Sequence, residues 1–402
     1  MTTTVKERQM KKNKNLWILV FISVINSLGF GILVPLIYPY SKQYGISEQT
    51  LGLLTASFSV AQFFATPLLG ALSDKYGRKP VLIFSLLGTC ASFILFAQAK
   101  TAFMLFAARI LDGITGGNIS VAQAMVSDSS SAQDKAKNFG ILSSAFGFGY
   151  VIGPAIGGLL SKFSLQTPFY VSAIVAMVGV LCAFFFLKES RQKKEKKDAE
   201  GKQNFNFLAL ITIFKKPVIG LAIFVGFLLT MAQFTMIIGF QTFSADGLKM
   251  NPFQIGLFFA GFGIAGIIMQ LCVPLLTKIF SSRSVILLLS VAACFLAIFF
   301  AGFTSALVGF ATCILLYGLF NGIRNPMLNA IISDRNKDGE QGQIMGINQS
   351  YASIGQVLGP ITGGLIIAWS IHYVFFLSAF YILGAFVITF WLKAKEKNSN
   401  GA

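Results

Sequence analysis

The stretch Gly149-Tyr-Val-Ile-Gly-Pro-Ala-Ile-Gly-Gly158 recurs 206 residues later as Gly355-Gln-Val-Leu-Gly-Pro-Ile-Thr-Gly-Gly364. The same offset relates Ser127-Asp128 to Ser333-Asp334, so the flanks of the repeated block keep its register. A ten-residue match with flanks in register is typical of a tandem duplication. The sequence therefore predicts two related halves that run in the same orientation.

The chain around this block carries few charges. Of its 402 residues, 55% are hydrophobic and 12% are charged, whereas soluble proteins carry about 25% charged residues. A net charge of +17 would suggest a nucleic-acid partner in a soluble protein, but here the charges gather between long apolar runs. The composition thus excludes a soluble domain and a nucleic-acid partner, and it makes the lipid bilayer the solvent for most of the chain.

Charge-free runs recur that are long enough for a membrane helix, which needs about 20 mostly apolar residues. They cover 15–41, 49–73, 80–99, 138–161, 163–187, 217–245, 250–277, 284–323 and 341–392. Each of the last two can hold two spans, and 101–127 adds a span interrupted by Arg109 and Asp112. The prediction is an all-α membrane protein of twelve transmembrane helices, in two six-helix bundles related by pseudo-two-fold symmetry. The strands of a membrane barrel would be about 10 residues long and alternating, so they are excluded.

The expected organisation is a tail, a six-helix bundle, a linker, a second bundle and a second tail, at 1–14, 15–187, 188–210, 211–392 and 393–402. Most of the 32 Lys and Arg residues fall in the tails, the linker and the loops of one side, so the positive-inside rule places both termini in the cytoplasm. The basic linker could rest against anionic lipid heads; a solvated linker is the plainer interpretation.

The loop between the second and third predicted helices reads Gly70-Ala-Leu-Ser-Asp74-Lys-Tyr-Gly77-Arg78-Lys79-Pro80. Gly70 permits close helix contact, Gly77 permits a tight turn, and Asp74 can pair with the basic residues. This pattern, with twelve helices and two related halves, resembles the signature loop of the major facilitator superfamily. The resemblance covers 15–392 and implies a membrane transporter rather than an enzyme.

The resemblance also implies that Asp74 and Arg78 belong to a cytoplasmic gate with an acid at the cytoplasmic end of the fourth helix. Asp128 is the matching acid. Such pairs close the cytoplasmic side when the transporter faces outward, and they break when it faces inward. In the second half Lys278 occupies the position of Asp74, so we expect the gate to be asymmetric.

The repeated block itself resembles a motif of the drug/proton antiporter branch, which includes tetracycline/proton antiporters and multidrug efflux transporters. Gly149, Gly153 and Gly157 recur every four positions and predict a flat face for close packing. Pro154, just before the last glycines of the block (Gly157 and Gly158), removes a backbone donor and favours a kink. The motif implies a sealed helix that limits proton leak; ordinary small-residue packing is the alternative.

Asp112 is the only acid well inside a predicted span, and Arg109 lies three positions before it on the same helix face. A charge at the bilayer centre costs at least about 2.5–3.5 kcal/mol. Burial favours the neutral carboxyl and a nearby arginine favours the carboxylate, so such a group can load and release a proton. We expect Asp112 to couple transport to protons, with Arg109 as its partner; a static ion pair is the alternative.

A polar stripe on the tenth predicted helix contains Asn321, Arg324 and Asn325 at helical spacing. A stripe with a buried arginine must face a cavity or a partner rather than lipid. Two alternatives stay open for Arg324: it binds an anionic or carbonyl group of a substrate, or it pairs with Asp112.

Two positions depart from the pattern of the exporters that the chain resembles. Several of these exporters have an acid in the first helix, at the position of Asn26. Some have an acid in the tenth helix, at the position of Asn321. Asn26 and Gln233 then add neutral hydrogen-bonding groups to helices that line the cavity in that family. A neutral, zwitterionic or anionic substrate is compatible with this set.

The predicted function is a proton-coupled secondary active transporter, an antiporter that exports a small amphipathic compound by alternating access. Proton-coupled or facilitative uptake of a small nutrient is the alternative, as is a non-transporting sensor of the same fold. We expect a monomer in the cell membrane whose partners are the substrate, protons and lipid. The sequence contains no phosphate loop, catalytic triad or metal-ligand cluster, so no cofactor is expected and the proton gradient is the expected energy source.

Overall fold

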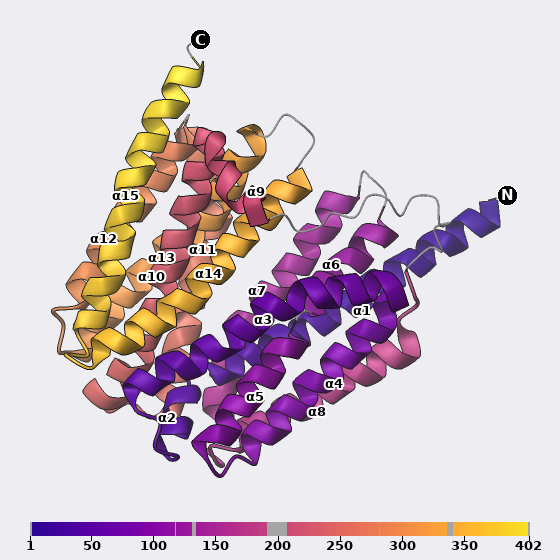
Figure 1. The fold of residues 1–402 in the computed structure, drawn as a ribbon, viewed down its shortest axis with the longest axis horizontal. Coiled ribbons are helices and arrows are strands. Elements are labelled where there is room, and N and C mark those ends of the chain that lie inside the picture. The colour runs from indigo at the N-terminus through magenta and orange to yellow at the C-terminus, as the bar shows by residue number, and fades with distance from the viewer. Residues whose placement is uncertain are drawn as a thin grey trace. The chain divides into compact units, whose positions relative to one another are not determined.

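The computed structural model describes residues 2–116, 118–130, 134–190, 207–280, 282–335 and 341–400, and all regular elements in these ranges are helical (Figure 1). The long helices are α1 (Thr2–Leu33), α3 (Glu48–Tyr76), α4 (Arg78–Ala97), α7 (Lys135–Leu160), α8 (Thr167–Phe186), α10 (Pro217–Thr242), α11 (Pro252–Ile279), α12 (Arg283–Ala301), α13 (Leu307–Arg335), α14 (Gln341–Ile367) and α15 (Tyr373–Asn400). The shorter elements are α2 (Ile37–Lys42), α5 (Ala102–Thr115), α6 (Asn118–Ser129), α9 (Phe207–Thr212), the 3-10 turn η2 (Ile213–Lys215) and the π-helical turn η3 (Phe243–Gly247).

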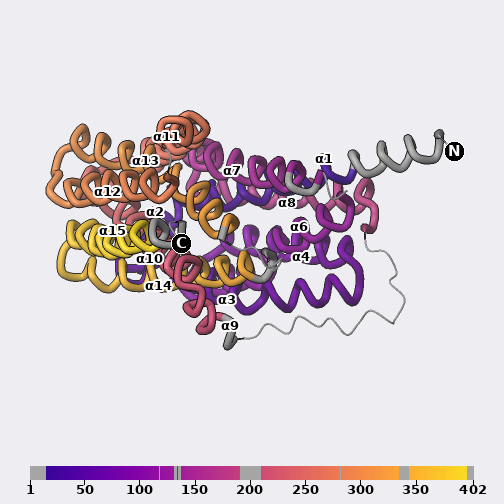
Figure 2. The backbone as a smooth tube through the Cα atoms, turned by 90° about the horizontal axis from the view of Figure 1, so that it is seen from above, coloured from indigo at the N-terminus to yellow at the C-terminus, as the bar shows by residue number. Residues whose placement is uncertain are grey.

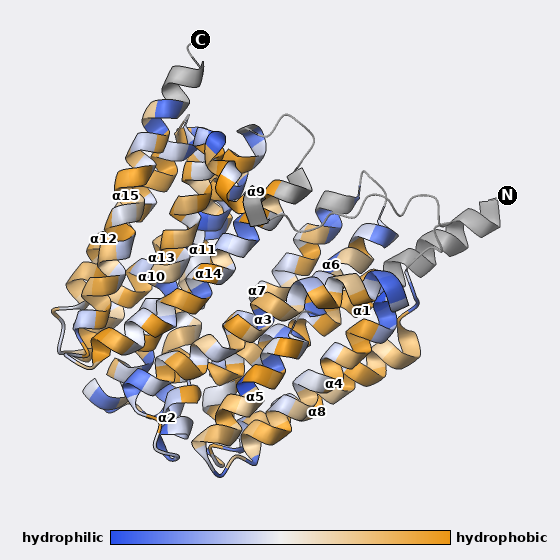
Figure 3. Ribbon diagram, viewed as in Figure 1, coloured by the Kyte–Doolittle hydropathy of each residue, from blue (hydrophilic) through white to orange (hydrophobic). Residues whose placement is uncertain are grey.

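Ten helices in the described part of the chain are long and apolar enough to cross a membrane. Hydrophobic residues run along their lengths, and hydrophilic residues gather toward their ends (Figure 3). The all-α membrane fold predicted from the sequence is confirmed. The two predicted spans outside these ten are 101–127, which is divided into α5 and α6, and the first part of 341–392, which forms α14.

The division of 101–127 was not predicted. α5 ends at Thr115 and α6 begins at Asn118, next to glycine, which costs about 1 kcal/mol inside a helix. The side-chain amide of Gln62, on α3, donates to the carbonyl oxygen of Gly116 at 3.1 Å. This bond satisfies an acceptor at the end of α5. At about 1.5 Å per residue, neither α5 nor α6 alone crosses a hydrocarbon layer about 30 Å thick.

The chain forms two compact units, and Figure 2 traces the backbone through both. Unit 1 comprises Met1–Ile46, Ser57–Asp198 and Asn251–Ala260, and unit 2 comprises Ser47–Ala56, Ala199–Met250 and Gly261–Ala402. Each unit therefore contains one copy of the duplicated block, on α7 in unit 1 and on α14 in unit 2.

In unit 1 the glycines of the block let α7 pack closely against α1. A Cβ added at Gly153 would lie 2.8 Å from the Cα of Gly31, and one at Gly157 would lie 2.6 Å from the carbonyl oxygen of Ile32. A larger residue would force the two helices apart, so the glycine stripe sets their separation. Unit 1 also contains a buried apolar cluster drawn from α1, α3, α4, α6, α7 and α8, and it includes Leu19, Ile22, Leu69, Leu82, Leu86, Val121, Met125, Leu142 and Val180.

In unit 2 the second copy of the block packs in the same way, with α14 against α10. A Cβ added at Gly355 would lie 3.0 Å from the carbonyl oxygen of Phe227, and one at Gly359 would lie 2.6 Å from that of Met231. At Gly363 the nearest atoms belong to Thr235 at 3.5 Å, an ordinary van der Waals distance. The duplication thus preserves the helix packing, with one looser position in unit 2.

Candidate functional site

The signature loop makes a tight turn between α3 and α4. Gly77 has a φ of +107°, a conformation that L side chains rarely adopt, and α4 begins at the next residue, Arg78. The close helix contact expected at Gly70 is wrong for this structure, because an added Cβ there would meet no described atom within 4 Å. The carbonyl oxygen of Gly70 instead accepts a hydrogen bond from the Ser73 hydroxyl at 2.7 Å.

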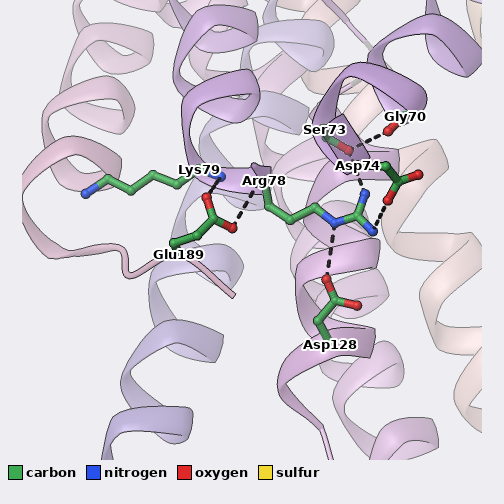
Figure 4. A network of polar contacts seen from close by, with 7 residues as sticks. All are labelled: Gly70, Ser73, Asp74, Arg78, Lys79, Asp128 and Glu189. Carbon is green, nitrogen blue, oxygen red and sulfur yellow. Dashed lines mark hydrogen bonds and ion pairs between the residues drawn. The ribbon is translucent and has the colours of Figure 1, made fainter. Parts of the chain in front are cut away.

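Ser73, Asp74, Arg78 and Asp128 form a group that we call the Arg78 cluster (Figure 4). The guanidinium contacts the carboxylate of Asp74 at 2.6 Å and that of Asp128 at 3.2 Å, and it donates to the Ser73 hydroxyl at 2.6 Å. The Arg78 side chain is only 13% exposed, so water screens these contacts less than it screens an open surface pair. The structure brings together the three charged residues that the sequence assigns to a gate; gating stays a prediction.

Glu189, which belongs to no sequence motif described above, caps α4 beside this cluster. Its carboxylate accepts hydrogen bonds from the backbone N–H groups of Arg78 and Lys79, both at 3.0 Å (Figure 4). Glu189 follows α8 by three residues and stands in the charged stretch 188–210, which the sequence predicts to be the linker. Nothing in its local pattern predicts a partner 110 residues earlier in the chain.

The equivalent loop of unit 2 has a simpler arrangement. Arg283, the first residue of α12, forms an ion pair with Asp334 near the end of α13. Their side chains are 42% and 58% exposed, respectively. Lys278 stands where unit 1 has Asp74. Unit 2 therefore has a lysine in place of the carboxylate that Asp74 supplies in unit 1.

Arg109 and Asp112 form a buried ion pair on α5. The Nη1 of Arg109 lies 3.5 Å from the Oδ2 of Asp112, and the two side chains are 3% and 15% exposed. The guanidinium also lies over the ring of Phe58, 4.3 Å from its centroid. A cation held over an aromatic face gains stabilisation that does not depend on the carboxylate. The arginine thus has a second favourable contact if its acidic partner becomes neutral.

A reciprocal amide pair joins α1 to the start of α6. Asn26 donates to Asn118 at 2.7 Å, and Asn118 donates back to Asn26 at 3.1 Å. Asn118 is 2% exposed. The sequence predicts a cavity role for Asn26 but not for Asn118, whose one local signal is a polar residue after two glycines inside an apolar run. The pair satisfies polar groups that would be costly to bury alone.

Arg324 lies at the matching place in unit 2. Its guanidinium donates to the side-chain oxygen of Gln233 at 2.7 Å, to the carbonyl oxygen of Leu229 at 2.9 Å, and to the side chain of Asn325 at 3.3 Å. Arg324 is 8% exposed, whereas Asn325 is exposed and Asn321 is half-buried. The structure thus brings Gln233, Arg324 and Asn325 together, with α10 and α13 holding the group.

The remaining predicted residues lie along α7. A Cβ at Gly149 would lie 2.6 Å from the carbonyl oxygen of Val24, and one at Gly158 would lie 2.9 Å from that of Pro252, which also belongs to unit 1. Pro154 lies within the helix. The motif residues therefore serve close packing in this structure, and a role in limiting proton leak stays a prediction.

Relatives in sequence are proteins named for resistance to drugs. The chain is 32% identical to the class D tetracycline resistance protein of Salmonella ordonez, over 87% of this chain and 88% of the relative. It is 29% identical to the class B protein of Escherichia coli over 87% of both chains. It is 27% identical to multidrug resistance protein 2 of Bacillus subtilis (strain 168), over 97% of this chain and 99% of the relative.

Similar solved structures support the fold. A bacterial homolog of the human lysosomal transporter Spinster, in an inward-facing and occupied conformation, matches with a TM-score of 0.76 at 13% identity, over 94% of this chain and 96% of that one. The nucleoside transporter NupG matches with a TM-score of 0.71 at 16% identity, over 94% and 98%. The sequence model described as "Major Facilitator Superfamily" matches residues 19–335 and 223–402. The chain therefore belongs to the Major Facilitator Superfamily and is a multi-pass membrane transporter of small molecules rather than an enzyme.

Proposed function

We propose that this transporter is a proton-coupled antiporter that exports a small amphipathic drug by alternating access. Its relatives are named for tetracycline, quinolone or multidrug resistance, which supports export of such compounds. We further propose that it acts as a monomer in the cell membrane with both termini in the cytoplasm. The excess of Lys and Arg in the loops on one side supports this orientation.

The contact between Arg109 and Asp112 carries the proposal of proton coupling. Protonation of the carboxylate removes its attraction to Arg109, and deprotonation restores it. The attraction between Arg109 and the ring of Phe58 does not depend on the charge of Asp112. The charge of α5 therefore differs between the two protonation states, and a difference of this kind can favour two different conformations. Asp112 is 15% exposed, which leaves the carboxylate a route to protons.

Arg324 and its neighbours are proposed to recognise the substrate. The guanidinium can donate to a carbonyl or anionic oxygen, and Gln233 and Asn325 already hold it in place. In unit 1 the pair of Asn26 and Asn118 offers neutral donors and acceptors. This chemistry suits a neutral, zwitterionic or anionic compound, because no acid stands among these five residues to attract a cation.

The Arg78 cluster is proposed to act as the cytoplasmic gate. Its contacts are ion pairs between the ends of α3, α4 and α6. Ion pairs that are partly open to water form and break at modest cost, as a gate requires. The proposed cycle joins this opening and closing to the loading of Asp112 and to the binding of substrate near Arg324.

The variant Asp112→Asn tests the proton-coupling role. In proteoliposomes with an imposed pH gradient, we expect the variant to lose gradient-driven accumulation of tetracycline and of a quinolone. Substrate counterflow without a gradient should persist, because exchange of substrate for substrate requires no net proton movement and so no change of charge at residue 112. Asp134→Asn, which removes an acid at the start of α7, serves as a control and should keep both activities.

Retention of gradient-driven accumulation in Asp112→Asn would contradict its role as proton carrier. Loss of counterflow as well would also contradict it, because the residue would then serve folding or substrate binding. The direction of proton flow separates export from import: substrate added on the cytoplasmic side should draw protons to that side in an antiporter.

A further inference from the structure

We propose that Glu189 is a positioning residue for the Arg78 cluster, through which the start of the linker holds the signature loop in place. This inference deepens the proposed function, since it concerns the gate of the same transporter. The segment that carries it is Leu187–Ser190, which directly follows α8 and includes the start of the linker.

The two hydrogen bonds of Glu189 replace a cap that the loop itself does not supply. The first N–H groups of a helix have no partner within the helix, and Gly77, at the N-cap of α4, has no side chain to accept from them. The carboxylate of Glu189 accepts from the N–H groups of both Arg78 and Lys79 at 3.0 Å. A negative charge at a helix N-terminus is also favoured by the helix dipole.

The turn at Gly77 is shaped to admit this carboxylate. A Cβ at Gly77 would lie 2.6 Å from the Oε2 of Glu189, which is closer than real Cβ atoms come to other atoms. The φ of +107° already favours glycine at this position. Gly77 thus serves the turn and the capping contact at once.

Further hydrogen bonds fix the segment that presents Glu189. Asn15 of α1 donates to the carbonyl oxygen of Lys188 and accepts from its N–H, both at 3.1 Å. Lys79 reaches back to α8, where its ammonium group donates to the carbonyl oxygen of Phe184 at 2.7 Å. The segment is therefore tied to α1 on one side and to α4 on the other.

Arg78 is the residue at which the capping contact and the cluster meet. Its N–H is held by Glu189, while its guanidinium reaches Asp74 and Asp128 (Figure 4). When the guanidinium contacts break during transport, the backbone of Arg78 stays fixed by Glu189, and the side chain returns to the same carboxylates. Loss of Glu189 should therefore slow the return of the gate and lower the maximal rate, without weakening the binding of substrate.

Hydrogen exchange measured by mass spectrometry on the purified full chain tests the capping contact. In Glu189→Ala we expect the amides of Arg78 and Lys79 to exchange about tenfold faster than in the wild type, because a hydrogen bond to a charged group is lost. Glu189→Gln keeps the reach and one acceptor, so its exchange should be intermediate. Asp134→Asn leaves every bond of Figure 4 in place and should match the wild type.

A double-mutant cycle in transport tests the positioning role. We expect Glu189→Gln and Asp128→Asn each to lower the maximal rate of tetracycline transport about three- to tenfold, with KM unchanged. The double variant should be no slower than the slower single variant, because both act through Arg78. Multiplied effects, a raised KM in Glu189→Gln, or unchanged exchange in Glu189→Ala would overturn the proposal. The exchange result does not depend on which compound is transported, so it remains decisive if the proposed drug export fails.

Discussion

In unit 1, Arg78 contacts two carboxylates, whereas in unit 2 Arg283 contacts Asp334 and Lys278 occupies the place of the other acid. The side chain of Arg78 is 13% exposed and that of Arg283 is 42% exposed. Since exposure and solvent screening weaken an ion pair, the loop of unit 1 is held more firmly. Both units thus keep an ion pair between an arginine and an aspartate at this loop. Among the described residues, only in unit 1 does the arginine contact a second carboxylate that further restrains the loop.

The interiors of the two units differ in a related way. Asn118 and Arg324 are 206 residues apart, the offset of the duplicated block, and each contacts an amide side chain, Asn26 or Gln233. At the same offset Asp112 of unit 1 corresponds to Gly318 of unit 2. The two copies therefore share a polar contact between equivalent helices. They differ in two respects: only unit 1 has the acid Asp112, and only in unit 2 is one partner of the polar contact an arginine. We propose that the residue that carries the proton lies in unit 1 and that the arginine that recognises the substrate lies in unit 2.

The largest effect on transport is expected from a comparison of Arg109→Gln with Arg324→Gln, which tests this division between the units. Removal of Arg109 leaves the Asp112 carboxylate buried without its ionic partner, a change that costs about 3–5 kcal/mol for buried pairs. Arg109→Gln should lose gradient-driven transport and unfold at a lower temperature. Arg324→Gln should raise KM about tenfold and keep coupling to the gradient. Transport assays in proteoliposomes with and without a gradient would measure both; equal loss of coupling in the two variants would contradict the division.

The comparison of the two loops predicts a smaller effect. Arg78→Gln should lower the maximal transport rate about tenfold, because it removes hydrogen bonds between charged groups that are partly shielded from water. Arg283→Gln removes an exposed pair and should stay within about twofold of the wild type. Initial rates of substrate efflux at saturating concentration would show the difference. A larger loss in Arg283→Gln would mean that the loop of unit 2 is the functional one.

The glycine blocks allow a matched test of stability. Gly157→Ala places a Cβ 2.6 Å from the carbonyl oxygen of Ile32, whereas Gly363→Ala places one 3.5 Å from Thr235. Overpacking of this kind costs about 1–3 kcal/mol, so Gly157→Ala should lower the midpoint of thermal unfolding. Gly363→Ala should leave it unchanged or raise it slightly, because alanine favours helix. If both variants lose stability equally, the looser fit of unit 2 is contradicted.

The smallest effect is expected from Lys278→Asp, which gives unit 2 the acid that unit 1 has at Asp74. Lys278 is exposed, so a new contact with Arg283 would be screened by water. The transport rate should change by less than about twofold, measured beside the wild type and Lys278→Gln. A strong inhibition confined to the aspartate variant would show that a second complete charge cluster traps the transporter.

The sequence was sufficient for the features that depend on composition and spacing. The run 284–323 was expected to hold two spans, and it contains α12 and the first part of α13, with a break between Ala301 and Leu307. The glycine spacing predicted a packing face, and α7 uses that face against α1. Both features follow from local patterns, because hydrophobic length and helical period are read along a single segment.

The features that the sequence did not provide depend on contacts between distant segments. Glu189 lies in a charged stretch, and its role follows only from the approach of α4. Asn118 pairs with a residue 92 positions earlier. The expectation of close contact at Gly70 was wrong because glycine also occurs where nothing packs against it. No local pattern distinguishes these cases, since the partner side chains are set by tertiary packing.

The break between α5 and α6 also bears on how the protein enters the membrane. α5 has 14 residues and carries Arg109 and Asp112, and each charge costs about 2.5–3.5 kcal/mol at the centre of an inserting helix. The segment 101–127 is therefore poorly suited to insert by itself. It needs α4, against which α5 packs, and α3, whose Gln62 satisfies the open carbonyl of Gly116. During synthesis, the part of the chain that carries the proposed proton site depends on helices that were made before it.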